Sequence, residues 1–169
     1  MATRVQDIDL GYKEFKKFVL GLKATGPDVL VGLIGSDAEA KHEDAPGLTV
    51  AAIGAIHEFG VDEPPVKIPQ RSWLRAPFDE NRRKYEVLLA RLTRSMILGG
   101  KGMTMERALG IVGIITEEDI RKAIRKKIPP ALKPATIRAK GSDVPLIDSA
   151  QLIQSITHLV VANAEKIAL

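Results

Sequence analysis

The residues that could carry chemistry are few, and His57 with Glu58 is the first pair to test. A metalloprotease helix places two histidines four residues apart, with a glutamate directly after the first, so that both imidazoles face one metal ion. Here the residue four positions after His57 is Val61, so the second ligand is missing. His42 and His158 stand at no ligand spacing to His57. We expect a structural or recognition role for His57, with a small hydrolase that uses this histidine as an alternative.

Other catalytic patterns are also incomplete. The chain has no cysteine, which excludes disulfides, thiolate ligands and cysteine nucleophiles. The serines do not stand in a glycine-flanked nucleophile elbow, and GGKG at 99–102 lacks the spacing and the hydroxyl residue of a phosphate-binding loop. The carboxylates Glu117, Glu118 and Asp119 are expected to occupy a first helical turn or to face water. The sequence therefore predicts no enzyme, no cofactor and no metal site.

Positive charge gathers late in the chain, although the formal net charge is only +4. Such side chains pair with phosphate or with an acidic protein partner. Aromatic residues for base stacking are absent from this region, so we predict at most nonspecific contact with DNA. A nonspecific nucleic-acid-binding protein and a simple solvated helix face are the alternatives. The basic cluster consists of Arg121, Lys122, Arg125, Lys126, Lys127, Lys133, Arg138 and Lys140.

The bulk composition is that of a globular protein with an aliphatic core. Of the 169 residues, 45% are hydrophobic but only 4% are aromatic, and we expect a single domain over 1–169. No apolar run approaches the roughly 18 residues that a membrane span needs. The N-terminus carries charges throughout and lacks the apolar core of a signal peptide. We therefore predict synthesis in the cytoplasm and no membrane partner.

Hydrophobic periodicity predicts the regular elements that would position these residues. Two long amphipathic helices are expected at about 72–98 and 104–127. Shorter helices are predicted at 12–24, at 49–60 and after Asp148, where Gln151 three residues later completes a capping box. Apolar β-branched runs at 29–35 and 157–161 predict strands. The predicted fold class is α+β, with a small, mainly antiparallel sheet packed against two long amphipathic helices plus short helices.

Three stretches are predicted to be irregular. The polar residues 36–47 show no periodicity and read as a mobile loop. Residues 60–72 form a proline-rich arm without regular structure, because its prolines remove hydrogen-bond donors and push their predecessors toward extended geometry. Residues 135–147 read as a loop or a hairpin, and 162–169 as a C-terminal tail.

Three motifs together carry a resemblance to a known family. They are IHEFG (56–60), IPQRSWLR (68–75) and PATIRAKGSDVPLIDSAQLIQSI (134–156). In this order the chain resembles the tail-completion and head-tail joining, or neck, proteins of long-tailed bacteriophages, close to the virion morphogenesis proteins of Mu-like phages. The match covers roughly residues 50 to 160. The chain departs from the usual pattern at Trp73, where phenylalanine is common, and at Ser149-Ala150, which replaces Thr-Gly.

The resemblance implies a structural virion protein without catalytic residues. It implies a homo-oligomeric ring, hexameric or dodecameric, that caps the tail tube and joins it to the head connector. Its partners would be further copies, a tail-terminator or tube protein and the connector, with nonspecific contact to packaged DNA. A tail-terminator or another morphogenesis factor is the alternative within virion biology. The motif positions become determinants of fold or assembly, including Gly60, Leu146, Asp148 and Leu152.

Physical reasoning supports a docking role for the proline-rich arm. A proline-stiffened segment loses little entropy when it binds, and Trp and Arg are enriched at interface hot spots. The alternative is that Trp73 fills the core of its own subunit at the start of the long helix. The predicted interface residues are Glu58, Phe59, Pro69, Arg71, Trp73, Leu74 and Arg75.

Overall fold

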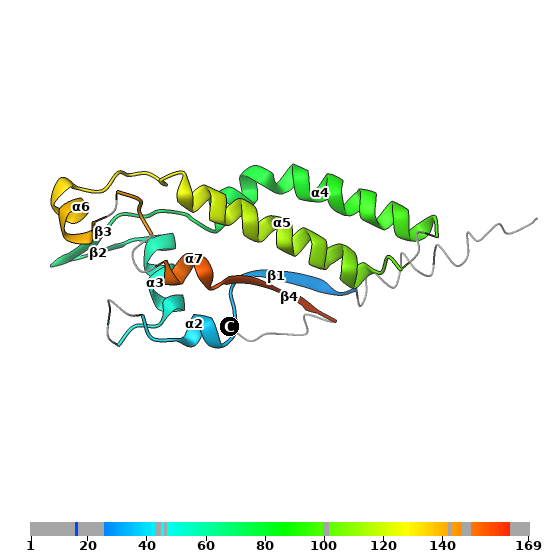
Figure 1. Ribbon diagram of the computed structural model, residues 1–169, viewed down its shortest axis with the longest axis horizontal. Helices are drawn as coiled ribbons and strands as arrows, with labels where there is room; N and C mark the ends of the chain where they lie inside the picture. Colours follow the sequence, from blue (N-terminus) through cyan, green and yellow to red (C-terminus); the bar gives the residue numbers. More distant parts are fainter. Residues whose placement is uncertain are drawn as a thin grey trace, which may run out of the picture.

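The computed structural model describes residues 16, 26–42, 45, 47–99, 102–141, 143–146 and 150–162. Of the helix predicted at 12–24, only Lys16 lies within this part, where it is helical and exposed. Asp148 and residues 163–169 of the predicted tail lie outside the described residues. The fold is α+β, as the sequence predicts, with helices against small antiparallel sheets (Figure 1).

A two-stranded antiparallel sheet joins distant parts of the chain. It pairs β1 (Asp28–Leu33) with β4 (Ile156–Val161), so that Asp28 faces Val161 and Leu33 faces Ile156. Both strands lie close to the predicted positions. Because the two strands are separated by most of the chain, the sheet places residues near both ends side by side. Figure 1 shows β1 and β4 running together beneath the long helices.

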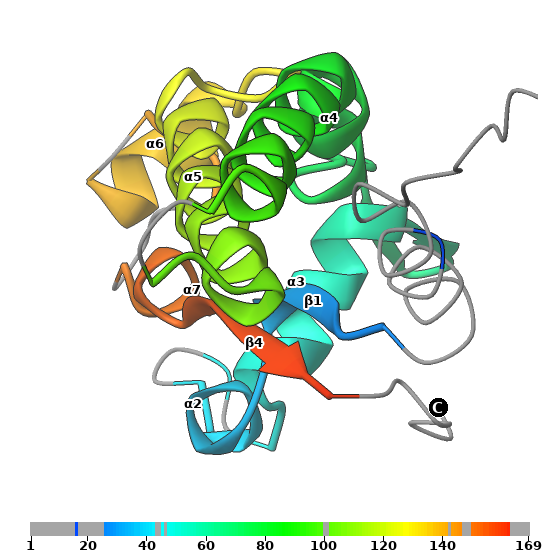
Figure 2. The same cartoon turned by 90° about the vertical axis from the view of Figure 1, so that its right-hand side faces the viewer.

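Two long helices cover this sheet. The helix α5 (Met105–Arg125) packs on β1 and β4, and α4 (Arg75–Ile97) packs against α5. The end-on view in Figure 2 shows these layers, with α4 and α5 above the sheet. Both helices match the predicted ranges, because their apolar residues repeat every three or four positions. The core is aliphatic around one indole and comprises Val50, Trp73, Ile120, Ile124, Leu152, Ile153 and Ile156.

The shorter helix α3 (Val50–Phe59) has the predicted ends. The Thr49 side chain accepts a hydrogen bond from the Ala52 N–H at 3.1 Å and so caps the first turn. Gly60 ends the helix with a φ of 76°. A Cβ at this position would lie 2.8 Å from the backbone nitrogen of Gln70, so both the backbone angle and the close approach require glycine.

The proline-rich arm is regular, and the prediction of irregular structure at 60–72 is wrong over most of its length. Two short strands, β2 (Val61–Glu63) and β3 (Val66–Ile68), form an antiparallel hairpin. Pro64 and Pro65 stand at its turn, where no ladder donor is required, so the prolines do not disrupt the pairing. Figure 1 places this hairpin at one end of the molecule.

Two predicted loops also need correction. Part of the expected mobile loop 36–47 is ordered as α2 (Ser36–Glu39), and Lys41 pairs with Thr49 in an isolated bridge. The expected loop at 135–147 contains α6 (Pro134–Lys140), which has proline in its first turn and the left-handed Gly141 after its last. Pro134 and Gly141 are standard residues for the two ends of a helix, and both are visible in the sequence.

The capping box predicted around Asp148 and Gln151 does not form in the expected register. The helix α7 (Gln151–Gln154) begins at Gln151, after Ala150 in a left-handed conformation. Gln151 is therefore the first helical residue instead of the third. Its side-chain amide donates to the Lys41 carbonyl at 3.1 Å, which ties α7 to the segment after α2.

Two glycines of α5 provide a matched test of how closely this helix packs on β4. A Cβ at Gly113 would lie 2.5 Å from Cδ2 and 3.0 Å from Cβ of His158, whereas a Cβ at Gly110 would meet no atom within 4 Å. We expect Gly113→Ala to destabilise the fold by about 1 to 3 kcal/mol through overpacking. Gly110→Ala should stabilise it by about 0.5 to 1 kcal/mol through helix propensity. Urea unfolding of both variants checks this, and equal effects would contradict the close packing.

Candidate functional site

The first two motifs meet at one buried carboxylate. Glu58 lies in the last turn of α3 and is only 4% exposed. Its carboxylate accepts hydrogen bonds from Ser72 Oγ at 2.7 Å, from the Leu74 N–H at 2.9 Å and from Arg75 Nε at 2.8 Å. Leu74, the residue that precedes α4, provides no side-chain acceptor for the helix start. Glu58 therefore takes the place of a capping side chain for α4, from a different helix.

The environment of Glu58 favours its charged form. Burial alone would raise the pKa of this carboxyl group. The hydrogen bonds from Arg75, the Leu74 N–H and Ser72 outweigh that effect, and the pKa is lowered from its ordinary value of 4.5. The ionised carboxylate is thus the form that holds α3 and α4 together.

A second motif residue, Arg71, is bound to a distant loop. Its guanidinium is buried and donates from Nε at 3.1 Å and from Nη2 at 2.8 Å to the Pro130 carbonyl. Its backbone N–H donates to the His57 carbonyl at 2.7 Å. Burial lowers the pKa of Arg71. Arg71 therefore fixes the segment after α5 to the end of α3.

The indole of Trp73 is buried in the core of its own chain. It is 2% exposed, and Nε1 donates to the Gly54 carbonyl at 2.9 Å. Gly54 makes room for this ring, because a Cβ there would lie 3.2 Å from Trp73 Cζ2 and 2.6 Å from Leu33 Cδ1. The expectation that Trp73 anchors a partner is therefore corrected in favour of the alternative that it fills the core.

The burial of these side chains reduces the set of predicted interface residues that a partner could contact. Glu58, Arg71 and Trp73 act inside the chain, and Leu74 is half-buried against the same core. For Glu58, Arg71 and Trp73 the assignment to a partner surface is corrected, because no second chain can reach buried side chains while the fold is intact. Leu74 is partly exposed, and its assignment to the interface stays a prediction. The other predicted interface residues, Phe59, Pro69 and Arg75, remain exposed.

Phe59 and Arg75 form an exposed pair beside the hairpin. The Phe59 side chain is 63% exposed, and the Arg75 guanidinium carbon lies 4.8 Å from its ring centroid. Val66 of β3 is also exposed. An aromatic ring held by arginine next to a projecting hairpin has the composition of an interface hot spot.

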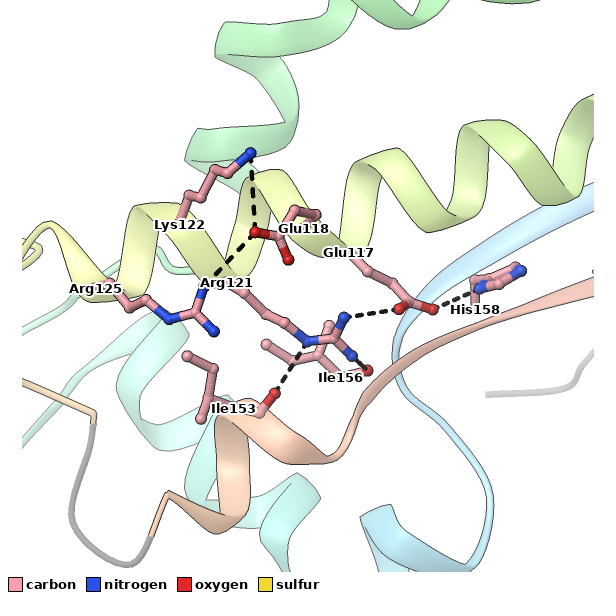
Figure 3. Close-up of polar contacts among 8 residues, drawn as sticks. All are labelled: Glu117, Glu118, Arg121, Lys122, Arg125, Ile153, Ile156 and His158. Atoms are coloured by element: carbon pink, nitrogen blue, oxygen red, sulfur yellow. Dashed lines mark hydrogen bonds and ion pairs between the residues drawn. The ribbon is translucent and has the colours of Figure 1, made fainter.

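Four of the eight residues in the basic cluster are ion-paired among the described residues. Lys122 and Arg125 both pair with Glu118, at 3.8 and 3.7 Å, and Lys127 pairs with Asp143 at 2.5 Å. Arg121 pairs with Glu117 at 2.9 Å and donates to the Ile153 and Ile156 carbonyls (Figure 3). Arg121 thus joins α5 to the start of β4 and does not belong to an open cationic face.

The remaining basic residues are more available. Lys126, Lys133 and Arg138 are exposed, and no ion pair is found for them among the residues that the structure describes. Lys140 is the last residue of α6. The cationic surface is therefore smaller than the sequence predicts, and it is centred on the end of α5 and on α6.

Two acidic residues of α5 are more buried and more closely paired than the sequence predicts. Glu117 is buried and binds both Arg121 and Nδ1 of His158, which lies on β4 (Figure 3). Asp119 accepts from Lys84 and from the Tyr85 hydroxyl of α4. Burial and Asp119 raise the pKa of Tyr85. The expectation that these carboxylates occupy a first turn or face water is wrong for Glu117 and Asp119, because their helix is covered by its neighbours.

Among the described residues, the Glu117–His158 pair brings together titratable side chains of α5 and β4. The nearby Thr116 hydroxyl donates to the Val112 carbonyl and is thereby engaged in its own helix. Within the described ranges, no group of three or more histidine, cysteine or acidic side chains is arranged to hold a metal ion. Among the described helices, none has the length and hydropathy to cross a membrane. The contact between Glu117 and His158 joins α5 to β4.

Comparisons with known proteins add no further information. No protein-family model matches the chain, and no curated protein or solved structure gives a match.

Proposed function

We propose that this protein is a structural subunit of a bacteriophage virion, positioned in the neck or at the head-proximal end of the tail. In this role further copies form a ring that caps the tail tube and joins it to the head connector. A tail-terminator or another morphogenesis factor is a close variant of the same proposal. The protein acts by assembly and not by catalysis.

One observation carries the proposal: the three motif stretches converge in space. Glu58 of the first stretch binds Ser72, Leu74 and Arg75 of the second. Trp73 of the second packs in one core cluster with Leu152 of the third. Residues that are far apart in sequence but share one buried junction behave as a fold signature. This convergence supports the interpretation that the three motifs belong to one family pattern and do not resemble it separately by chance.

The exposed features beside this junction suit a ring contact. The β2–β3 hairpin and the Phe59–Arg75 pair adjoin the buried residues that fix them, so a partner would meet a preorganised surface. A heterologous contact that closes by rotation generates a ring. Lys126, Lys133 and Arg138 supply the charge for nonspecific contact with packaged DNA in such a ring.

Removing the protein from its virus tests the proposal. We expect particles made without it to contain separate heads and tails in electron micrographs, and joining to return when the wild-type protein is supplied in trans. A second supply carrying Phe59→Asp should fold but fail to restore joined particles, because a charge replaces the exposed ring. Particles that join normally without the protein would overturn the proposed function.

A further inference from the structure

An open groove lies between β1, α4 and α5. Its volume is about 580 Å³. The strand β1 supplies one wall and the two long helices supply the others. Figure 2 shows how these three elements are arranged. The floor is apolar and includes Val29, Val31, Leu89, Leu109, Val112 and Ile120. A hollow of this kind is larger than the packing voids of a well-filled interior.

The rim of the groove is charged, in contrast to its floor. Arg75, Asp79, Arg82 and Glu86 of α4 line it on one side with both signs of charge. An apolar floor beside a charged rim is the usual receptor for an amphipathic helix, whose apolar face enters while its polar face stays in water. A small polar ligand would find few hydrogen-bonding groups on this floor.

The chain itself contains a segment with the matching pattern. Tyr12, Phe15, Val19 and Leu22 recur at helical spacing within 12–24, and over a helix they would cover about 15 Å on one face. The other positions include four lysines, at 13, 16, 17 and 23. Lys16, the described residue of this segment, is helical and exposed, as the polar side of such a helix requires.

The position of the segment in the chain favours the groove over other surfaces. The segment ends a few residues before β1, and Val29 and Val31 of β1 form part of the groove floor. Gly26 and Pro27 stand between them, where a chain reversal is readily made. A segment tethered this closely has an effective concentration of about millimolar or more at the groove, which favours intramolecular docking.

We propose that the groove between β1, α4 and α5 is the docking site of the chain's own residues 12–24, held through Tyr12, Phe15, Val19 and Leu22. The inference concerns the single chain and does not depend on the proposed function.

Cross-linking in the full-length chain tests this proposal. Because the sequence has no cysteine, an introduced pair is the only thiol pair present. We expect a short bismaleimide to join the cysteines of Val19→Cys/Leu89→Cys efficiently. The yield should not depend on protein concentration, and the product should run as a monomer on a gel. The matched pair Lys16→Cys/Leu89→Cys should be joined several-fold less, because Lys16 is exposed. Peptide mass spectrometry identifies the linked residues.

The alternative occupants give different results. A product that runs as a dimer and increases with concentration would mean that a second copy provides the segment, which overturns the proposal. Equal yields from the Val19 and Lys16 pairs would also overturn it. Dye binding provides a readout without cysteine: Val19→Asp should expose the groove and raise the fluorescence of an apolar dye several-fold, whereas Lys16→Asp should not. An unchanged signal from Val19→Asp would contradict docking.

Discussion

Replacing Glu58 with alanine is expected to lower the free energy of unfolding by about 2 to 4 kcal/mol, because it removes the shared acceptor of several hydrogen bonds and the cap of α4. The carboxylate is 4% exposed and accepts hydrogen bonds from Ser72, Leu74 and Arg75. Alanine would leave the Leu74 N–H without its acceptor and would break the connection between α3 and α4. Chemical denaturation followed by far-UV circular dichroism measures the loss.

Two substitutions separate the role of Glu58 from a general effect of removing charge. Glu118→Ala removes a carboxylate that is also paired with two cations but is half-exposed, so we expect a change of about 0 to 1 kcal/mol. Glu58→Gln retains one acceptor oxygen and should cost less than alanine, about 1 to 3 kcal/mol. If Glu58→Ala cost no more than Glu118→Ala, Glu58 would not be the cap of α4.

The same carboxylate should contribute a pH dependence. Its pKa is lower in the folded chain than the ordinary value of 4.5, so folding favours the ionised form. This contribution is complete above about pH 4.5 and is lost as the pH falls through the lower folded value. We therefore expect the wild type to lose more stability than Glu58→Gln between pH 5 and about pH 3. Denaturation midpoints across that range provide the measurement, and parallel curves would contradict it.

The long helices and their covered faces could be predicted because local pattern and tertiary structure agree there. In α5, Leu109, Val112, Ile120 and Ile124 recur at helical spacing, and all four are buried. The ends of α3 followed from Thr49 and Gly60, whose roles depend on their own backbone and immediate neighbours. The strands β1 and β4 were identifiable from β-branched runs, but their pairing with each other was not a local property.

The errors arose where position relative to another element decides the outcome. Prolines 64 and 65 disrupt a strand but suit a hairpin turn, and the difference depends on how β2 and β3 pair. Glu117 reads as a solvated carboxylate until β4 brings His158 onto it, 41 residues further along the chain. Charge patterns show which ions are present, but the folded partner determines which of them remain free.

Trp73 shows the same limit at the candidate site. An indole flanked by Arg71 and Arg75 has the composition of an interface anchor, and the sequence left open whether it faces a partner or its own core. The decision rests on Gly54, 19 residues earlier, whose missing side chain makes space for the ring and whose carbonyl accepts its N–H. Neither feature is visible in the motif that contains the tryptophan.

Replacing Trp73 with alanine should therefore destabilise the isolated chain by about 3 to 5 kcal/mol, because it removes a large side chain from a packed core and leaves a cavity. Trp73→Phe keeps most of the apolar contact but leaves the Gly54 carbonyl without its donor, which should cost about 1 to 3 kcal/mol. Because Trp73 is the single tryptophan, far-UV circular dichroism during urea unfolding serves for all variants.

Phe59→Ala is the matched aromatic control, and it separates fold from assembly. Its ring is 63% exposed, so its loss should change stability by about 0.5 kcal/mol or less. If the proposed ring uses the surface beside the hairpin, Phe59→Ala should weaken self-association while the fold persists, whereas Trp73→Phe should weaken the fold and leave self-association of the folded fraction intact. Analytical ultracentrifugation below the unfolding transition distinguishes the two. A Trp73→Ala chain as stable as the wild type would show that the indole does not fill the core.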